Sequence, residues 1–329
     1  MSMIATLNFL LIVIILCFLF LAYIRVSGIR EDKLFGSMNR IKGNDSDSSM
    51  REKKEHMTML QLNANVKIIP NLIWTYLVSM NETRRLCLNS WKYQNPNTQI
   101  IILNPNNIYE YVEYNSSNAE NLESEQKAYD FLPFYLLQKY GGIWMTPSTI
   151  CTRSLNWVHE KKGKDFIGFY MGDLNTNKNP ILENWFMASP AHSKLMFEVM
   201  EELDRSKQFP DISTYIKSIR EEGLNIQEIP YPEFLKLHLV FQRVIQSTLF
   251  NSTTYSIELI DATQGNGPLS YLKENNWNST FALKRLCAQK FMINYPLIQL
   301  REKEMNLVED GEANVDCFAV PQAVKVWIE

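Results

Sequence analysis

Hydrophobic residues along this chain form short continuous runs that alternate with amphipathic, helix-like stretches. Val66–Tyr76 and Thr98–Asn104 have the length and apolar character of buried strands, and the segment 84–93 between them has the pattern of a helix. Continuous apolar runs are typical of strands covered on both faces of a parallel sheet. Strands alternating with helices therefore predict an α/β domain with a mixed, mainly parallel sheet flanked by helices.

The same alternation continues through the rest of the chain. A helix-like run over 124–139, which contains Asp130, precedes two glycines and the apolar Ile143-Trp144-Met145. Because glycine tolerates positive φ, Gly141 and Gly142 predict the end of a helix and a turn into a buried strand. We expect further strands over 164–170 and 183–188, and further helices over 107–112, 193–206, 230–249 and 281–289.

The longest apolar run lies near the amino end. Phe9–Ile24 is almost wholly apolar, and with the residues back to Ile4 it reaches roughly the 20 residues of a membrane helix. A cleaved signal peptide is the alternative, but no basic segment precedes the run and no Ala-x-Ala site follows it. The sequence thus predicts a short tail (1–8), a transmembrane anchor (9–24), a polar stem (25–65) and a folded domain (66–329). Basic residues follow the anchor and none precedes it, so the positive-inside rule by itself favours a cytoplasmic domain.

Composition narrows the function. The 329 residues carry a net charge of −3 and no basic block with interleaved aromatics, which argues against a nucleic-acid partner. The cysteines lack Cys-x-x-Cys spacing, which argues against a zinc site. Beyond the anchor, four cysteines form either disulfides or buried free thiols: Cys87, Cys151, Cys287 and Cys317. Motifs of P-loop ATPases, zinc proteases and α/β-hydrolases do not occur.

Polar residues follow the Gly-Gly strand where a ligand would bind. Thr146-Pro147-Ser148 comes directly after Met145, and ligands of open α/β sheets bind at the carboxyl ends of strands. We expect the strand to run back along the preceding helix, so that Asp130 and Thr146 face one pocket. Glu183 is the best spare carboxylate for a general base, although a loop charge would look the same.

The order of these features resembles glycosyltransferases of the capsular polysaccharide synthesis type and, more distantly, the sugar-transferase families with an Asp-x-Asp motif. The resemblance covers about residues 66–310. Its landmarks are Ile69-Pro70-Asn71-Leu72-Ile73-Trp74, Ser90-Trp91, Asn95-Pro96, Asp130, Tyr140-Gly141-Gly142-Ile143-Trp144, Asn184-Trp185-Phe186, His238 with Gln242, Gly267-Pro268 and Pro296–Arg301. It implies a Rossmann-like, GT-A-type fold.

The resemblance also implies a function. It describes a single-pass type II membrane glycosyltransferase, of hexosyltransferase type, in the lumen of the Golgi or another secretory compartment. Such an enzyme moves a sugar from a nucleotide-sugar donor to a glycan or glycoprotein acceptor. The alternative is a catalytically inactive relative that binds glycans or a partner enzyme.

The chain departs from the family pattern at the position of the metal ligand. Thr146 stands where the family has an acidic residue that holds Mn²⁺ or Mg²⁺, and a hydroxyl rarely replaces a carboxylate for a hard cation. We therefore assign no metal ligand and expect any dependence on Mn²⁺ or Mg²⁺ to be weak. A second departure is Pro133, where the wider families often have arginine.

Roles for individual residues follow from the resemblance, each with a structural alternative. The catalytic candidates are Thr146, Ser148, Glu183 and His238. The donor-binding candidates are Trp74, Asp130, Gly141, Gly142, Trp185 and Gln242. His238 and Gln242 lie four residues apart and hence on one helix face. A core tryptophan, a core histidine and a helix-surface aspartate are the alternatives for Trp74, His238 and Asp130. Asp173, in a polar loop, is a weaker candidate for meeting the acceptor.

Overall fold

The computed structural model describes residues 67–113, 128–172, 180–226, 232, 236–249 and 255–318. The predicted anchor (9–24), the predicted stem (25–65) and Asp173 lie outside these ranges, and the domain boundaries stay a prediction. Among the described residues, no helix combines the length and the apolar character that a membrane span requires.

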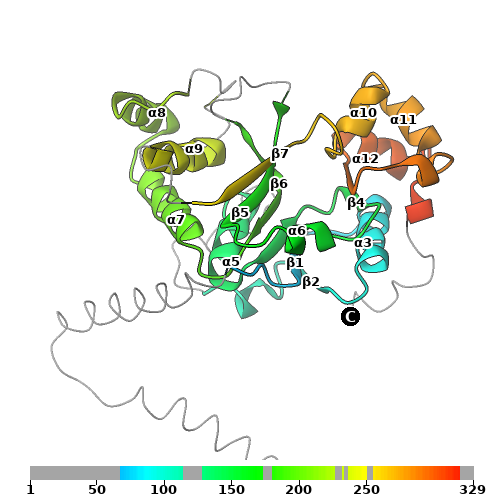
Figure 1. Ribbon diagram of the computed structural model, residues 1–329, viewed down its shortest axis with the longest axis horizontal. Helices are drawn as coiled ribbons and strands as arrows, with labels where there is room; N and C mark the ends of the chain where they lie inside the picture. The colour runs from blue at the N-terminus through cyan, green and yellow to red at the C-terminus, as the bar shows by residue number, and fades with distance from the viewer. Residues whose placement is uncertain are drawn as a thin grey trace, which may run out of the picture. The chain divides into compact units, whose positions relative to one another are not determined.

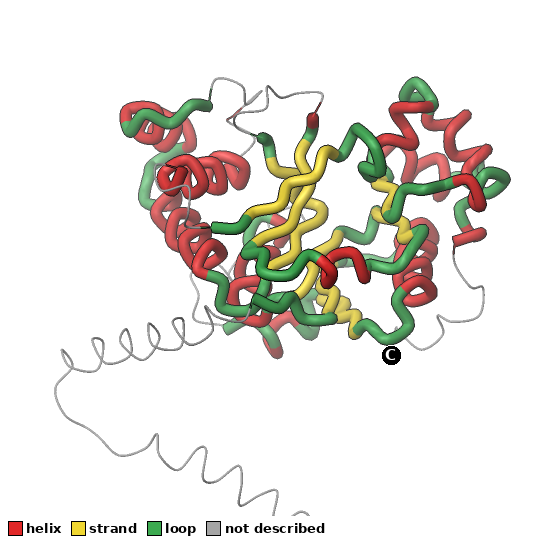
Figure 2. The backbone as a smooth tube through the Cα atoms, in the orientation of Figure 1, coloured by secondary structure: helices red, strands yellow, loops and turns green. Residues whose placement is uncertain are grey.

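A six-stranded sheet forms the centre of the domain (Figures 1 and 2), with the strand order β2-β1-β3-β6-β5-β7. The strands are β1 (Leu72–Tyr76), β2 (Gln99–Leu103), β3 (Gly142–Met145), β5 (Phe166–Tyr170), β6 (Leu182–Ser189) and β7 (Ile257–Asp261). β1 runs parallel to β2 and β3, and β5 runs parallel to β7. β6 is antiparallel to both of its neighbours. The predicted mixed, mainly parallel α/β sheet is confirmed, and the other strands all end at the edge where β6 begins; we call it the carboxyl edge.

Helices cover both faces of this sheet, as Figure 1 shows. One face packs against α5 (Leu132–Tyr140), α7 (Lys194–Lys207), α8 (Ile212–Glu221) and α9 (Lys236–Leu249). The hydrophobic core on the other side contains residues of α3 (Glu82–Gln94) and α6 (Asn156–Glu160), and it continues into α10 (Ser270–Glu274), α11 (Ser279–Leu286) and α12 (Glu302–Glu309). Neighbouring residues of a strand point to opposite faces. Ile73 lies in the core on the α3 side of the sheet, and Trp74 lies in the core on the α5 side. Both faces are therefore apolar, as the continuous runs predict.

Shorter elements complete the described chain. They are the 3₁₀ turns η1 (Ile108–Glu110), η5 (Lys290–Met292) and η6 (Asp316–Phe318), and the strands β4 (Thr149–Cys151) and β8 (Leu297–Gln299). β4 and β8 pair antiparallel as a separate small sheet. This pairing matters for function because only three residues, Thr146–Ser148, separate β3 from β4.

The expected helix over 124–139 is wrong in its continuity. The chain is helical at Ala128 and Tyr129, turns at Asp130 and Phe131, and begins α5 only at Leu132. Pro133 explains the break, because it has no N–H to donate to the carbonyl of Tyr129 and its ring clashes with that carbonyl. The structure also differs over 107–112, where only the 3₁₀ turn η1 forms, and it adds α6, α8, α10, α12, β4, β7 and β8, which we did not predict.

The glycine turn between α5 and β3 has the predicted geometry. Gly141 and Gly142 have φ values of 66° and 102°, in the region that favours glycine. A Cβ on Gly141 would lie 2.3 Å from the backbone nitrogen of Ala191, and one on Gly142 would lie 2.6 Å from the carbonyl oxygen of Leu72. Both glycines are therefore required by dihedral angle and by space.

The cysteines divide between the two alternatives that the sequence leaves open. Cys287 and Cys317 form a disulfide bond, whereas Cys87 and Cys151 are free and buried in the core. The disulfide joins the end of α11 to η6 and so ties the carboxyl-terminal part of the described chain to the α10–α12 lobe.

Candidate functional site at the carboxyl edge

Four polar side chains form a continuous hydrogen-bonded group where β3 ends, which we call the hydroxyl cluster: Thr146, Ser148, Thr149 and Gln299. The Thr146 and Ser148 hydroxyl oxygens lie 3.0 Å apart. Gln299 donates from Nε2 to Ser148 Oγ at 3.0 Å and accepts from Thr149 Oγ1 at 2.6 Å. Thr146 is 7% exposed. The cluster joins the large sheet to the small one and puts neutral hydroxyls at the end of a parallel strand.

Gln299 is a member of this cluster that sequence reasoning did not select. The available signal was the apolar run Pro296–Leu300, which matched a landmark of the resemblance but was not predicted as a strand. β8 forms because Thr149, Ile150 and Cys151 of β4 pair with Gln299, Ile298 and Leu297. That register places Gln299 beside the residues that follow β3.

Glu183 and Trp185 lie on β6 at the same edge. The backbone N–H of Thr146 donates to the carbonyl of Trp185 at 2.9 Å, so Thr146 lies opposite Trp185, two residues from Glu183. β6 also bulges there, because Gly168 pairs with Met187 but Tyr170 pairs with Leu182. Bulges occur preferentially beside active sites, where they redirect side chains.

The carboxylate of Glu183 is held in an apolar environment. Burial raises its pKa to about 6, and the hydrogen bond from Trp185 Nε1, at 2.9 Å, opposes part of that rise. The Trp185 ring stacks on Phe169 with their centroids 5.1 Å apart. A carboxylate with a pKa near 6 at a strand end has the character of a general acid or base.

Asp130 occupies the turn before α5 and is exposed. The neighbouring Tyr129 donates from its hydroxyl to the carbonyl of Tyr76, the last residue of β1, at 3.0 Å. Its ring lies 5.8 Å from that of Trp144. Asp130 and Thr146 are therefore both brought to the carboxyl edge, and a pocket shared by the two stays a prediction.

His238 and Gln242 lie on one face of α9, as predicted, and contact the entry to β6. Gln242 is fully buried and donates from Nε2 to the carbonyl of Pro180. His238 is hydrogen-bonded to the backbone of Leu182, and burial lowers its pKa to about 4. These contacts position the strand that carries Glu183; the predicted roles of His238 in catalysis and of Gln242 in donor binding stay predictions.

The buried His238 should make folding sensitive to acid. The unfolded chain takes up a proton near pH 6.5, whereas the folded chain takes it up only near pH 4. Stability should therefore fall as the pH drops from 6.5 to 4, by about 3 kcal/mol at 1.36 kcal/mol per pKa unit. His238→Gln keeps a hydrogen-bond donor but does not titrate. Between pH 7 and pH 4, urea unfolding should show a loss of unfolding free energy that is about 3 kcal/mol smaller in this variant than in the wild type. An equal loss of stability in the variant would contradict this assignment.

Trp74 and the two glycines lie elsewhere in the sheet. Trp74 is 1% exposed and donates from Nε1 to the carbonyl of Gly141 at 2.9 Å. Gly141 and Gly142 lie at the amino end of β3, opposite the carboxyl edge. Their contacts are those of a core tryptophan and a strand-entry turn, and their predicted part in donor binding stays a prediction.

Asp261 is a further carboxylate at the carboxyl edge, and sequence reasoning missed it. It is the last residue of β7, and its Oδ1 accepts from Thr263 N at 2.8 Å and from Thr263 Oγ1 at 2.9 Å. Gly172 packs so closely that a Cβ there would lie 1.9 Å from Asp261 Oδ2. Because β7 was not predicted, nothing in the sequence placed Asp261 at a strand end.

The hydroxyl cluster does not suit a hard divalent cation. Mn²⁺ and Mg²⁺ prefer charged oxygen ligands, whereas Thr146, Ser148 and Gln299 offer neutral oxygens already bonded to one another. Within the ranges described above, no three His, Cys, Asp or Glu side chains gather as a metal site would require. The predicted weak dependence on Mn²⁺ or Mg²⁺ stays a prediction.

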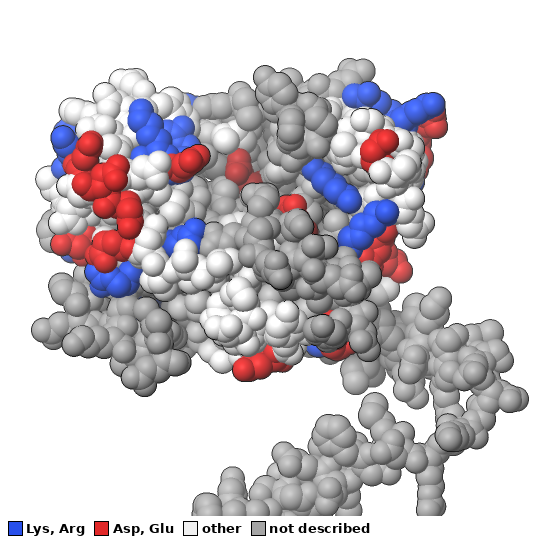
Figure 3. All heavy atoms as spheres, turned by 180° about the vertical axis from the view of Figure 1, so that it is seen from behind, with Lys and Arg blue, Asp and Glu red and all other residues white. Residues whose placement is uncertain are grey.

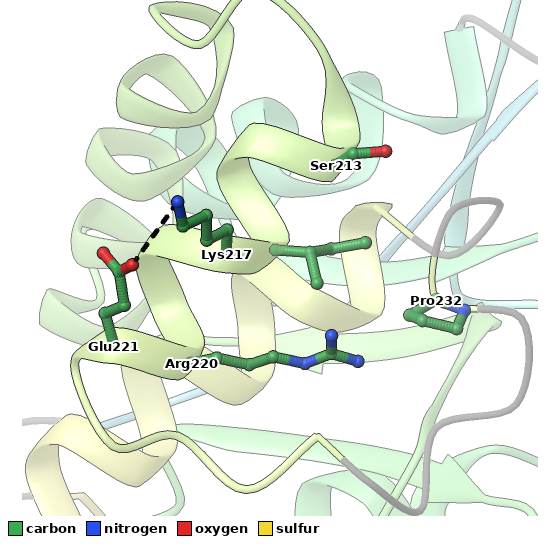
Figure 4. Close-up of a pocket in the computed structure, with 6 residues that line it drawn as sticks. Ser213, Lys217, Arg220, Glu221 and Pro232 are labelled. Atoms are coloured by element: carbon green, nitrogen blue, oxygen red, sulfur yellow. Dashed lines mark ion pairs between the residues drawn. The ribbon is translucent and has the colours of Figure 1, made fainter.

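A separate pocket lies on the outer side of α8 (Figure 4). Its lining residues are Ser213, Ile216, Lys217, Arg220, Glu221 and Pro232. Lys217 and Glu221 form an ion pair of 3.9 Å across its rim. None of the predicted site residues lines this pocket, so it is distinct from the carboxyl edge.

Charges of both signs are mixed on the surface of the domain. On the face drawn in Figure 3, acidic and basic side chains occur together at the left and at the right of the view.

Comparisons with known proteins bear on the predicted resemblance. Residues 49–205 match a protein family described as "Capsular polysaccharide synthesis protein". A solved structure named "PaToxG Glycosyltransferase" aligns with 81% of this chain and 94% of its own, at 12% identity and a TM-score of 0.36. No curated protein matches the chain. The matched segment contains β1, α3, β2, α5, β3 and β6. Residues 49–205 are therefore similar to the capsular polysaccharide synthesis family, which confirms over that segment the resemblance predicted from the ordered motifs.

Proposed function

We propose that this protein is a membrane-anchored glycosyltransferase that moves a hexose from a nucleotide sugar to a glycan or glycoprotein. The observation that carries the proposal is the arrangement at the carboxyl edge: Glu183, with its pKa raised to about 6, lies on β6 two residues from Trp185, whose carbonyl accepts from the backbone N–H of Thr146 in the hydroxyl cluster. The family match over residues 49–205 supports the same activity. The GT-A-type classification of the fold is part of the proposal.

The proposed reaction is a nucleophilic substitution at the anomeric carbon of the donor. The acceptor hydroxyl forms the new C–O bond, the bond from the anomeric carbon to the diphosphate oxygen breaks, and the nucleoside diphosphate leaves with the electron pair. Glu183 takes the proton of the acceptor hydroxyl, which suits a carboxylate that is ionised at neutral pH but basic enough to accept a proton. Thr146 and Ser148 hold the donor by hydrogen bonds, and Asp130 binds one of its sugar hydroxyls.

The proposed location is the lumen of the Golgi or another secretory compartment, with residues 9–24 as a type II anchor. The Cys287–Cys317 disulfide supports this location, because disulfides persist in oxidising compartments and are rare in the cytosol. It outweighs the basic residues after the anchor, which favour the opposite orientation.

The test is turnover by the full chain in detergent, supplied with a panel of nucleotide sugars and glycan acceptors. We expect acceptor-dependent release of nucleoside diphosphate, with little loss when EDTA replaces Mn²⁺, because Thr146 supplies no charged ligand. Calorimetry with UDP and GDP on the same folded protein measures donor-site binding separately. Folded protein that neither binds a nucleoside diphosphate nor releases one would overturn the proposal.

One observation favours a second candidate, an inactive relative that binds glycans or a partner enzyme. Thr146 replaces the family's acidic residue, and its hydroxyl is engaged by Ser148. That candidate predicts nucleotide or glycan binding without turnover across the whole panel.

A further inference from the structure

Resting on the proposed glycosyltransferase function, we propose that Arg301 is the cation that receives the leaving diphosphate at the carboxyl edge. The leaving oxygen gains negative charge as the bond to the anomeric carbon breaks, and an enzyme stabilises that charge with a metal or with a fixed cationic group. The hydroxyl cluster offers a divalent cation no charged oxygen ligand, and a side-chain cation at the same edge would supply the positive charge instead.

The register of the small sheet brings Arg301 to this edge. Thr149 pairs with Gln299, and the next residue continues the ladder because Leu300 N donates to the carbonyl of Ser148 at 2.9 Å. Arg301 has φ −85° and ψ 173°, so its backbone is still extended. One further step of the same register sets Arg301 beside Pro147, next to Thr146.

The side chain of Arg301 points to the same side of the extended chain as the hydroxyl cluster. Successive side chains of an extended chain point to opposite sides, so Arg301 shares a side with Gln299. Gln299 Nε2 contacts Ser148 Oγ at 3.0 Å, whereas the intervening Leu300 is buried in the core. Arg301 and the hydroxyl cluster therefore lie on one side of the strand that connects them.

A buried carboxylate holds the guanidinium in one orientation. Arg301 donates from Nε to Glu304 Oε2 at 3.0 Å and from Nη2 to Glu304 Oε1 at 2.8 Å. Glu304 is fully buried and also accepts from Ser279. The guanidinium carbon lies 4.8 Å from the centre of the Trp277 ring, while 43% of the Arg301 side chain remains exposed. Such fixing lowers the ordering cost of binding a ligand.

The unused part of the guanidinium has the chemistry of a phosphate site. An arginine has five N–H groups in a planar fork, and Glu304 occupies one each on Nε and Nη2. No hydrogen bond from Nη1 forms within the described part of the chain. The remaining N–H groups match the paired oxygens of a phosphate, which arginine binds in a bidentate manner.

A left-handed turn closed by a backbone hydrogen bond positions Trp277. Asn276 and Trp277 are consecutive residues with φ of 54° and 56°, a region that a bulky side chain rarely adopts. The N–H of Trp277 closes this turn on the carbonyl of Leu272 at 2.8 Å. Strained residues of this kind cluster at ligand sites, and this turn carries the aromatic ring that contacts the partly exposed Arg301 guanidinium.

The experiment compares Arg301→Gln and Arg301→Lys with Arg285→Gln in the full chain in detergent. Arg285 is a matched control, because its guanidinium also lies 4.8 Å from an aromatic ring, that of Phe281, in the same lobe. Glutamine at 301 still offers Glu304 a hydrogen-bond donor. Thermal unfolding checks that each variant is folded, and calorimetry compares UDP and GDP with uridine and guanosine.

Arg301→Gln should lower kcat for sugar transfer by about 10²–10³-fold, as the loss of one preorganised charge-stabilising donor does. It should weaken nucleoside diphosphate binding at least about tenfold and leave nucleoside binding unchanged, since only the diphosphate meets the guanidinium. Arg301→Lys should recover part of both, and Arg285→Gln should match the wild type. If the wild type turns over a donor and folded Arg301→Gln does so equally well, the role of Arg301 is contradicted while the proposed function stands. If the wild type binds no nucleoside diphosphate, the proposed function is overturned as well.

Discussion

Glu183→Gln should lower the rate of sugar transfer by about 10²–10⁴-fold, the usual contribution of a general base. Glutamine keeps the size of the side chain and an oxygen that accepts from Trp185 Nε1, so the hydrogen bond at 2.9 Å should survive. Only the ability to take a proton is lost. The measurement is kcat with the donor and acceptor that the wild type uses, and equal kcat in the two proteins would remove Glu183 from the mechanism.

The pH profile gives an independent test of the same residue. With a pKa of about 6, Glu183 is ionised above that pH, so activity should rise through pH 6 and level off near neutrality. The Trp185 hydrogen bond lowers the pKa of Glu183. Trp185→Phe should therefore move the rise in activity to higher pH. A profile that is identical in Trp185→Phe and the wild type would contradict this role.

Glu183→Gln should also stabilise the folded protein, and this separates a catalytic role of Glu183 from a structural one. The folded pKa of Glu183 is raised from 4.5 to about 6, so ionising it costs more in the folded than in the unfolded chain. The cost is absent below pH 4.5 and complete above pH 6. Removing the charge should then add about 2 kcal/mol at pH 7, at 1.36 kcal/mol per pKa unit. Urea unfolding at pH 4 and pH 7 measures it.

Glu258→Gln is the matched control for this stability effect. Glu258 lies on β7, which β5 separates from the β6 strand of Glu183, and hydrogen bonds from Lys161 and Lys164 lower its pKa. A depressed carboxyl pKa stabilises the folded state above its unfolded pKa and loses that contribution in acid, which is the opposite sign to Glu183. Glu258→Gln should therefore be neutral or slightly destabilising at pH 7, without an effect on kcat.

The sequence predicted the elements whose signal is local. The continuous runs around Ile73 and Ile100 became β1 and β2 because both faces of the sheet are covered by helices. The Gly141-Gly142 turn followed from glycine's access to positive φ. By contrast, two of the five residues of β7 are acidic and β8 is only three residues long, and each is a strand because a distant partner pairs with it.

The candidate site was predictable only where it lies within one stretch of chain. Thr146 and Ser148 could be selected because a single strand ends before them. Gln299 and Asp261 could not, since they reach the carboxyl edge through β8 and β7. Asp130 shows the reverse error: its helix pattern was clear, but Pro133 removed the hydrogen bond that a continuous helix needs.

Loss of the Cys287–Cys317 disulfide should be the largest single destabilisation of the described domain. The bond spans a sequence separation of 30 residues, and closing a loop of that length restricts the unfolded chain by about 3–4 kcal/mol. The loop contains β8 and α12, and with them Gln299 of the hydroxyl cluster. Loss of the disulfide should therefore lower both the stability of the domain and its affinity for the nucleotide.

The double variant Cys287→Ser/Cys317→Ser tests this with the wild type as its own reference. In urea unfolding, dithiothreitol should lower the free energy of unfolding of the wild type by about 3–4 kcal/mol. The double variant should have that lower stability without reductant, and dithiothreitol should not change it. Cys87 and Cys151 remain in both proteins, and burial raises the pKa of each thiol, so they supply little thiolate to interfere. Equal stability of the oxidised and reduced wild type would show that the loop is held by packing alone.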